Sequence, residues 1–139
     1  MIRELINSDY NMFLKLINKF RTTYFTKEQF INLLNTLKTQ NNIIYVYEID
    51  GIIIGTVKLI IETKFIFNIS YVGHIEDIFI DEKYRNMNIG KKLVEHCVNI
   101  AKNKKCYKII CVCLDDVKKF YLKCGFELRG NFMSKLIKL

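Results

Sequence analysis

The spacing of the apolar residues changes along the chain, and this change limits the possible folds more than any other feature of the sequence. Apolar side chains recur at helical spacing from Met12 to Phe20 and again from Phe30 to Leu37, each time after a helix-start signal. From Ile43 to Glu62 β-branched and aromatic residues follow one another closely, with the turn dipeptide Asp50-Gly51 between two runs. The sequence therefore predicts two amphipathic helices followed by a two-stranded hairpin.

The second half of the chain alternates between strand and helix patterns. These predict a strand over 73–80, a helix from Ile89 to about Lys102, a strand over 107–113 and a short helix over 115–123. Gly125 suits the end of the short helix, and the tail from Phe126 predicts one or two last strands. This order predicts an α/β (α+β) fold with a mixed sheet flanked by helices. No repeat or linker divides the 139 residues, so we expect a single domain over 1–139.

The apolar content predicts a packed core without a membrane span. Glu48 and Asp50 interrupt the apolar stretch from Ile43 to Ile54, and the N-terminus carries no signal-type apolar block. We therefore expect a soluble protein of the cytoplasm. The five cysteines are odd in number, lie in apolar segments and form no CxxC pair. They are interpreted as reduced, buried thiols, and no metal site is expected.

The chain carries a formal net charge of +8, which comes mostly from lysine. Such a charge favours an anionic partner, which could be a phosphorylated metabolite, a nucleotide cofactor or a nucleic acid. A solvated lysine surface explains the charge equally well. Composition alone therefore leaves both interpretations open.

The segment from Arg85 to Gly90 joins the predicted strand over 73–80 to the helix that begins at Ile89. An arginine, small or polar residues and a glycine ahead of a helix allow successive backbone N–H groups to point at a phosphate, and the helix dipole adds to the attraction. The loop fits a pyrophosphate. A plain surface turn before a helix has a similar pattern, so the loop alone does not decide between the two.

Glu76 and Asp77 are adjacent carboxylates in an otherwise apolar strand. Burying them without a cation or hydrogen-bond donors would be costly, so partners are expected. In a regular strand their side chains face opposite ways, with one in solvent and the other free to cap a helix. Both can approach one ligand only if a β-bulge breaks the alternation.

The strand, loop and helix from Gly73 to Leu93 resemble the acetyl-CoA site of the GNAT superfamily, whose loop follows the pattern Gln/Arg-x-x-Gly-x-Gly/Ala. Arg85 fills the first position and Gly90 the last, while Asn88 stands where the superfamily often has glycine. Asparagine is the least costly non-glycine residue at positive φ, so the turn can be retained. The resemblance implies a GNAT fold with a splayed strand pair and a bulge at the two carboxylates. It also implies that acetyl-CoA is bound by Ile78, Phe79, Ile80, Arg85, Asn86, Met87, Asn88, Ile89, Gly90 and Lys91.

Three further blocks, 74–78, 106–110 and 120–126, are similar to blocks of glucosamine 6-phosphate N-acetyltransferases in the same order and at similar spacing. The resemblance implies acetyl transfer from acetyl-CoA to the amine of D-glucosamine 6-phosphate, a step toward UDP-GlcNAc, by a homodimer without metal or acyl-enzyme. It implies a substrate site of Thr22, Lys64, Glu76, Asp77, Tyr107 and Lys108.

The resemblance also implies catalytic roles. Tyr121 would protonate the departing thiolate, and Glu76 would orient the amine or accept its proton through water, a task that a backbone carbonyl could equally perform. Three of the substrate residues have plainer interpretations, since Thr22 could be a helix-end hydroxyl, Lys64 a hairpin-surface lysine and Tyr107 a packing aromatic.

The chain departs from this family at several positions. Val112 and Val117 stand where the family has Asp and Asn, so side-chain contacts to the cofactor are lost there. In the tail, the spacing of a basic residue that reaches the neighbouring subunit's substrate phosphate gives Leu136, for which Lys135 or Lys138 could substitute.

Two other functions stay open. A GNAT enzyme acting on a protein or polyamine would need the Arg85 loop but not the set of Glu76, Asp77, Tyr107 and Lys108. A basic nucleic-acid-binding module would need neither, and the lysines here form no clustered tract and do not interleave with aromatic residues.

Overall fold

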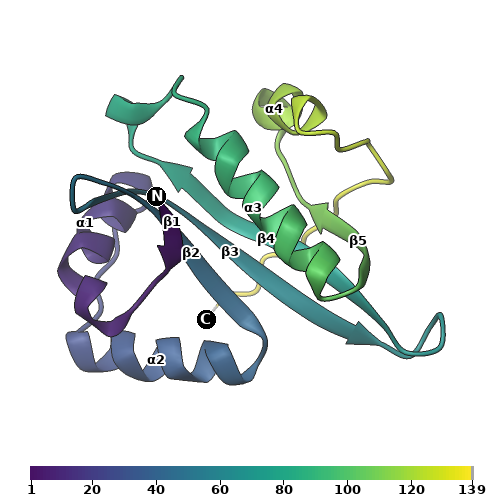
Figure 1. The fold of residues 1–139 in the computed structure, drawn as a ribbon, viewed down its shortest axis with the longest axis horizontal. Coiled ribbons are helices and arrows are strands. Elements are labelled where there is room, and N and C mark those ends of the chain that lie inside the picture. The colour runs from purple at the N-terminus through teal and green to yellow at the C-terminus, as the bar shows by residue number, and fades with distance from the viewer. Residues whose placement is uncertain (139) are drawn as a thin grey trace.

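The computed structural model describes residues 1–138 and confirms the α/β fold, a mixed sheet flanked by helices (Figure 1). The strands are β1 (Ile2–Glu4), β2 (Asn42–Ile49), β3 (Ile52–Lys64), β4 (Ser70–Ile80) and β5 (Cys106–Cys111). The helices are α1 (Tyr10–Phe20), α2 (Lys27–Thr39), α3 (Ile89–Asn103) and α4 (Lys118–Lys123). Single 3₁₀ turns are η1 (Asn7–Asp9), η2 (Glu82–Tyr84) and η3 (Asp115–Val117).

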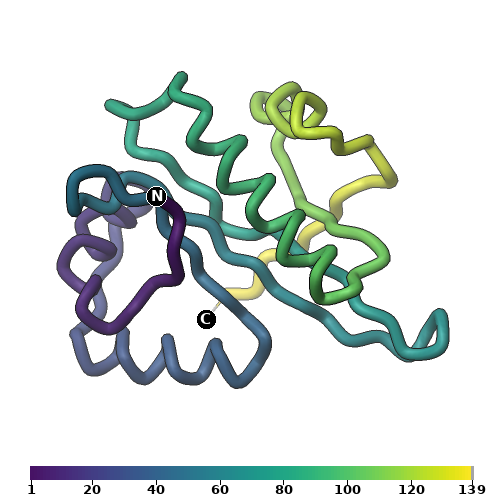
Figure 2. Tube along the Cα trace, in the orientation of Figure 1, coloured from purple at the N-terminus to yellow at the C-terminus, as the bar shows by residue number. Residues whose placement is uncertain are grey.

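The strands lie in the order β1-β2-β3-β4-β5, each antiparallel to the next except for the last pair. Strand β5 runs parallel to β4 because α3 carries the chain back across the sheet, as the tube in Figure 2 shows. The candidate site lies at this parallel pair of strands, on one side of the sheet.

Two cores cover the two faces of the sheet. On one face Leu93, Val94 and Cys97 of α3 pack with buried residues of β3 and β4. On the other face α1 and α2 bury Leu16 and Phe30 against β2 and β3. Helices α1 and α2 pack there mainly on the β1, β2 and β3 side, so they leave the part of this second face formed by β4 and β5 largely uncovered (Figure 1).

Local signals account for the start of α2 and the end of α4. Thr26 and Gln29 form the reciprocal capping box that starts α2, with N–H to side-chain oxygen distances of 3.1 and 2.8 Å. Gly125 has φ +86°, as expected after a helix C-terminus.

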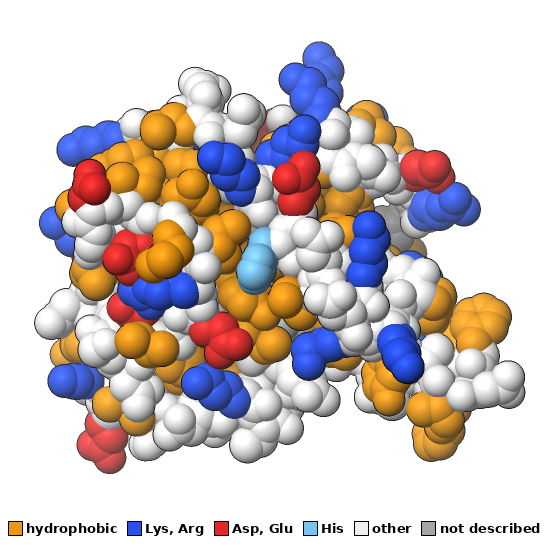
Figure 3. Space-filling view, viewed as in Figure 1, with side chains coloured by type: hydrophobic (Ala, Val, Ile, Leu, Met, Phe, Trp, Pro, Cys, Tyr) orange, Lys and Arg blue, Asp and Glu red, His pale blue; other side chains and the backbone are white. Residues whose placement is uncertain are grey.

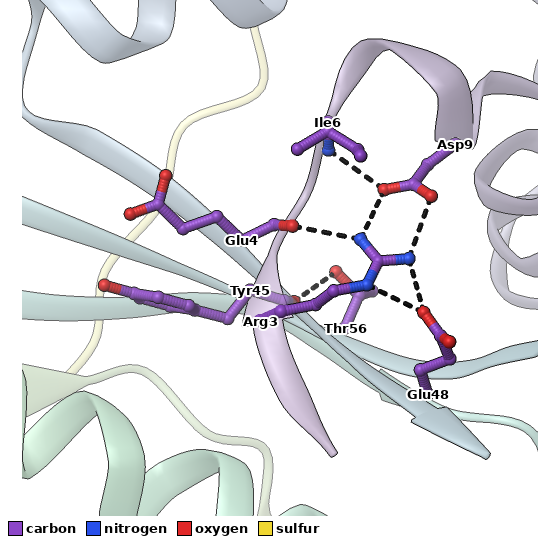
Figure 4. Close-up of polar contacts among 7 residues, drawn as sticks. All are labelled: Arg3, Glu4, Ile6, Asp9, Tyr45, Glu48 and Thr56. Carbon is purple, nitrogen blue, oxygen red and sulfur yellow. Dashed lines mark hydrogen bonds and ion pairs between the residues drawn. The ribbon is translucent and has the colours of Figure 1, made fainter. Parts of the chain in front are cut away.

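Strand β1 was not predicted, and a buried ion-pair network holds it (Figure 4). The Arg3 guanidinium donates to both carboxylate oxygens of Asp9, at 2.7 and 2.9 Å, and to Glu48 at 2.7 Å. Asp9 directly precedes α1, but its side chain makes no cap to that helix and accepts instead from Arg3 and from the Ile6 N–H at 2.9 Å. Burial raises the pKa of Asp9, but these hydrogen bonds outweigh it and hold that pKa below its usual value.

The prediction of last strands after Phe126 is wrong for the single chain. Residues 126–138 form no strand, and the large apolar side chains there are exposed, among them Leu128, Phe132, Met133, Leu136 and Ile137. The apolar pattern is present, but within the described residues the tail pairs with no strand. The prediction for the cysteines also needs correction: all are free thiols, yet only Cys97 is buried and the others are half-buried.

Within the described part of the chain, each helix is too short or too polar to cross a bilayer.

Candidate active site

A β-bulge lies where Glu76 and Asp77 were singled out. Thr56 pairs with Phe79 and Lys58 with Glu76, so β4 has one residue more than β3 between these pairs. Asp77 takes up the difference with φ +51°. The predicted break in alternation is therefore present.

The bulge places both carboxylates near one lysine. Glu76 is the register partner of Lys58, and Lys58 Nζ lies 3.3 Å from Asp77 Oδ2. These two acidic side chains therefore lie close to Lys58, on the part of the sheet that α1 and α2 leave uncovered.

Strands β4 and β5 separate just before the bulge. Their pairing ends at Ile75 and Cys111, while β4 continues to Ile80 and β5 leads away to α4 (Figure 1). Within the described residues, the backbone of β4 from Glu76 to Phe79 therefore pairs with no strand on this side and can bind an extended ligand, whereas the Ile80 carbonyl accepts a hydrogen bond from Arg85 Nε at 3.2 Å. This is the predicted splayed pair, and it contains Ile78, Phe79 and Ile80.

The loop from Arg85 to Gly90 closes the wide end of this splay. Asn86 and Asn88 have φ of +68° and +59°, which confirms that asparagine adopts the conformation expected at the fourth loop position. Asn88 then leads into α3, whose first turn contains Ile89, Gly90 and Lys91. Ile89 is buried, whereas Met87 and Lys91 are exposed. The free N–H groups of this helix start suit a pyrophosphate.

Gly90 packs closely against α4. A Cβ on Gly90 would lie 3.2 Å from the Phe120 ring, so a side chain here would have to displace that ring. Val112 and Val117, which replace polar residues of the family, are 52% and 41% exposed, so that side of the splay presents apolar groups.

The end of β4 is tied to α1 by contacts that the sequence did not reveal. Lys19 Nζ donates to Asp81 Oδ2 at 2.5 Å, and the Phe20 and Phe79 rings stack at 5.1 Å. The Arg85 guanidinium lies 5.7 Å from the Phe79 ring centre. Hydrogen bonding to Lys19 lowers the pKa of Asp81 and outweighs the opposing effect of burial.

Lys64 is held by a carboxylate. Lys64 Nζ lies 2.6 Å from one oxygen of Glu62, and His74 Nε2 lies 2.6 Å from the other. The hydrogen bond with Lys64, followed by that with His74, lowers the pKa of Glu62. Sequence reasoning missed Glu62, His74 and Lys58, although Lys58, Glu62 and Lys64 share one strand face by alternation.

Tyr107 and Lys108 lie on β5 beside this group. Lys108 Nζ is 5.5 Å from the Tyr107 ring centre, and the Tyr107 ring meets Phe67 edge-on at 5.0 Å. Among the described residues no carboxylate lies within ion-pair distance of Lys108. Lys108 therefore offers a cation that is less compensated than Lys58 or Lys64.

Thr22 is the predicted substrate residue that the structure does not join to the others. It lies exposed in the connection after α1, and no polar contact between described side chains links it to Lys64 or Lys108.

Tyr121 lies at the narrow end of the splay. It is 6% exposed, and its ring is held edge-on by Phe120 at 5.0 Å and Phe126 at 5.6 Å. Burial raises its pKa, and the nearby Cys111 thiol and Glu76 carboxylate add to the effect. The hydroxyl therefore stays protonated at neutral pH and can act as an acid. No group of three or more possible metal ligands occurs among the described residues.

The fold and this site define a class of proteins. The model of the acetyltransferase (GNAT) family matches residues 4–126, and the chain therefore belongs to that family. Glucosamine 6-phosphate N-acetyltransferase 1 of Dictyostelium discoideum is 40% identical over 114 residues, which cover 79% of this chain and 73% of that protein. Glucosamine 6-phosphate N-acetyltransferase of Arabidopsis thaliana is 35% identical over 140 residues, covering 96% and 94%.

The solved structures agree with the sequence relatives. The crystal structure of glucosamine-6-phosphate N-acetyltransferase from Arabidopsis thaliana matches with a TM-score of 0.94 at 34% identity, over 99% of this chain and 98% of that one. Within the GNAT family, the chain thus belongs with the glucosamine 6-phosphate N-acetyltransferases.

Proposed function

We propose that this protein transfers the acetyl group of acetyl-CoA to the amine of D-glucosamine 6-phosphate, by direct attack without an acyl-enzyme. The observation that carries the proposal is the meeting of two features at the Asp77 bulge. There the stretch of β4 backbone that is unpaired on the β5 side lies next to the charged side chains of β3, β4 and β5, which we call the polar face. A donor along β4 and an acceptor on the polar face would place their reacting groups at that point.

The donor is bound mainly by backbone groups. The loop and first turn of α3 hold the pyrophosphate, through residues 85–91, and the pantetheine arm pairs with Ile78, Phe79 and Ile80. Metal is not required for either contact.

The acceptor is bound by side chains of the polar face. Lys108 and Lys64 contact the phosphate, with Tyr107 and Thr22 beside the sugar. Glu76 and Asp77 approach the amine, and Asp77 pairs with Lys58, whose Nζ lies 3.3 Å from Asp77 Oδ2.

The reaction needs a neutral amine, an oxyanion donor and a proton for the leaving thiolate. The amine attacks the thioester carbonyl, and a backbone N–H of Ile78 or Phe79 stabilises the oxyanion. As the C–S bond breaks, the Tyr121 hydroxyl gives its proton to the sulfur. The amine loses its proton to water held by Glu76, or to a backbone carbonyl.

The protein acts as a homodimer in this proposal. The exposed tail described above and the tip of the β3–β4 hairpin both present large apolar side chains, of which Phe65 is 92% and Phe67 72% exposed. Figure 3 shows the apolar groups projecting at that tip. Exposed patches of this kind favour association. Because Lys58 and Lys64 are paired with carboxylates, Lys135 or Lys138 from the partner's tail would add positive charge for the phosphate.

A panel of acceptors tests the activity. With acetyl-CoA as donor, glucosamine 6-phosphate should be acetylated faster than glucosamine, a polyamine or a lysine peptide, measured by mass spectrometry. Faster acetylation of the polyamine or peptide would reject the proposed acceptor but not the donor. Sedimentation of the same preparation should give a dimer, and a monomer with full activity would reject the shared site.

A further inference from the structure

The carboxylate of Glu62 is shared between a lysine and a histidine on the polar face. One of its oxygens lies 2.6 Å from Lys64 Nζ, and the other lies 2.6 Å from His74 Nε2. Lys64 belongs to the same strand as Glu62, whereas His74 reaches it from β4. The side chains of Lys64, Glu62 and His74 are 33%, 40% and 24% exposed, so a ligand on this face can reach all three.

The carboxylate determines which nitrogen of His74 can gain a proton. The hydrogen bond with Lys64, followed by that with His74, lowers the pKa of Glu62, so at neutral pH this side chain is ionised and only accepts hydrogen bonds. His74 Nε2 therefore carries a hydrogen, and Nδ1 is the nitrogen that binds a further proton. The contact with Glu62 is compatible with both forms of the imidazole, and only the charge of the ring changes.

Other charged side chains lie around His74 on the same face. His74 pairs in register with Ile60 of β3 and Ile110 of β5, and paired residues point to the same face of a sheet. The titratable neighbours on this face are Lys58, Glu62 and Lys64 from β3, Glu76 and Asp77 from β4, and Lys108 from β5. Within the described residues, the tail contributes no ion pair to this group, and Glu62 alone bonds to His74. Protonation of His74 therefore acts first on the Lys64–Glu62 pair.

We propose that His74 is a positioning residue for Lys64, and that it sets how strongly this lysine binds the acceptor's phosphate. The inference rests on the proposed function, in which Lys64 and Lys108 contact that phosphate. While His74 is neutral, Glu62 compensates Lys64. Once His74 is protonated, the imidazolium compensates Glu62, and Lys64 presents its full charge to the phosphate. Phosphate binding therefore strengthens as the pH falls through the range in which histidine side chains titrate.

The chain has two histidines, so NMR can follow each imidazole separately. With CoA bound, so that no acetyl transfer occurs, saturating glucosamine 6-phosphate should raise the titration midpoint of His74 by about 0.5 on the pH scale, which equals about a threefold gain in affinity on protonation. Glucosamine should leave that midpoint unchanged. His96 packs against Tyr45 on the other face of the sheet, and neither sugar should affect it.

Three variants separate the charge of His74 from its hydrogen bond. His74→Gln keeps a donor for Glu62 but cannot be protonated, so KM for glucosamine 6-phosphate should fall about threefold more in the parent than in this variant between pH 8 and pH 6. Ionisation of the phosphate and of the amine affects both proteins equally, and His96→Gln should behave as the parent does. Glu62→Gln should lower KM at pH 8 about threefold, because Lys64 is then uncompensated, whereas loss of a purely structural contact would raise KM.

The outcomes separate this inference from the proposed function. An unmoved His74 midpoint, with glucosamine 6-phosphate acetylated by the same preparation, would overturn the role of His74 and leave the activity intact. Equal pH dependence of KM in the parent and in His74→Gln would do the same. A raised midpoint without acetylation would reject the proposed acceptor but keep the phosphate beside His74, and an unmoved midpoint without acetylation would reject both.

Discussion

The donor and acceptor sides of the site are built by different means. On the proposed donor side, a strand, a loop and a helix start that follow each other in sequence offer backbone groups for a ligand. On the acceptor side, side chains from β3, β4 and β5 converge, and several of them are already paired with opposite charges. The donor side is therefore set by local geometry, whereas the acceptor side depends on a balance of charges.

The hydroxyl of Tyr121 is the proposed general acid between the two sides, and its removal should have the largest effect. Tyr121→Phe should lower kcat about 10²-fold or more, because a positioned general acid is lost while the packing ring stays. Acetyl-CoA affinity should change little. Turnover is measured after confirming that chemistry limits it, and a kcat within about threefold of the parent would remove Tyr121 from the mechanism.

On the donor side, acetyl-CoA binding should weaken when a substitution displaces the backbone at the start of α3. Gly90→Val places a branched side chain against Phe120 and should raise KM for acetyl-CoA about tenfold, with a lower melting temperature. Gly90→Ala should give a smaller change of the same sign. An unchanged acetyl-CoA KM in the Val variant would show that the start of α3 does not contact the cofactor.

Acid should weaken the tie between α1 and the end of β4. The pKa of Asp81 is lowered in the folded state, so its ionised form stabilises the fold at pH values above its ordinary pKa of 3.8. This contribution is lost as pH falls from there through the folded-state value. The melting temperature should therefore drop by a few degrees more in the parent than in Asp81→Asn between pH 5 and pH 3. Equal drops would mean that the Lys19 contact adds no stability.

On the acceptor side, removing a lysine whose charge is already compensated by a carboxylate should change KM only slightly. Lys64→Met should raise KM for glucosamine 6-phosphate no more than about threefold, because Glu62 offsets the ammonium charge at 2.6 Å. Steady-state kinetics at saturating acetyl-CoA measure it. A change larger than that of Lys108→Met would reverse the ranking of the two lysines.

The same contrast explains what could be predicted from the sequence. The hairpin and α3 follow from local patterns, the turn Asp50-Gly51 and the helical spacing after Ile89, while the bulge at the paired carboxylates was implied by the family resemblance; the structure confirms all three. The Asn88 conformation was also predicted, because backbone preference there depends on one residue.

Contacts between distant segments were not predictable in this way. The pairing of β1 depends on Arg3 reaching Asp9 and Glu48, and the contact of Glu62 with His74 joins two strands. The last strands predicted after Phe126 are absent because apolar alternation supplies a pattern but no partner strand. The individual roles of the site residues stay predictions.

The central claim is tested most directly by measuring glucosamine 6-phosphate and glucosamine as acceptors, both in the parent and in Lys108→Met. The ratio of kcat/KM for glucosamine 6-phosphate to that for glucosamine should be roughly tenfold to a hundredfold in the parent, the worth of one or two charge-assisted hydrogen bonds. In Lys108→Met the ratio should fall about tenfold, with glucosamine turnover unchanged. Equal kcat/KM for the two sugars in the parent, or an unchanged ratio in Lys108→Met, would contradict a phosphate site at Lys108.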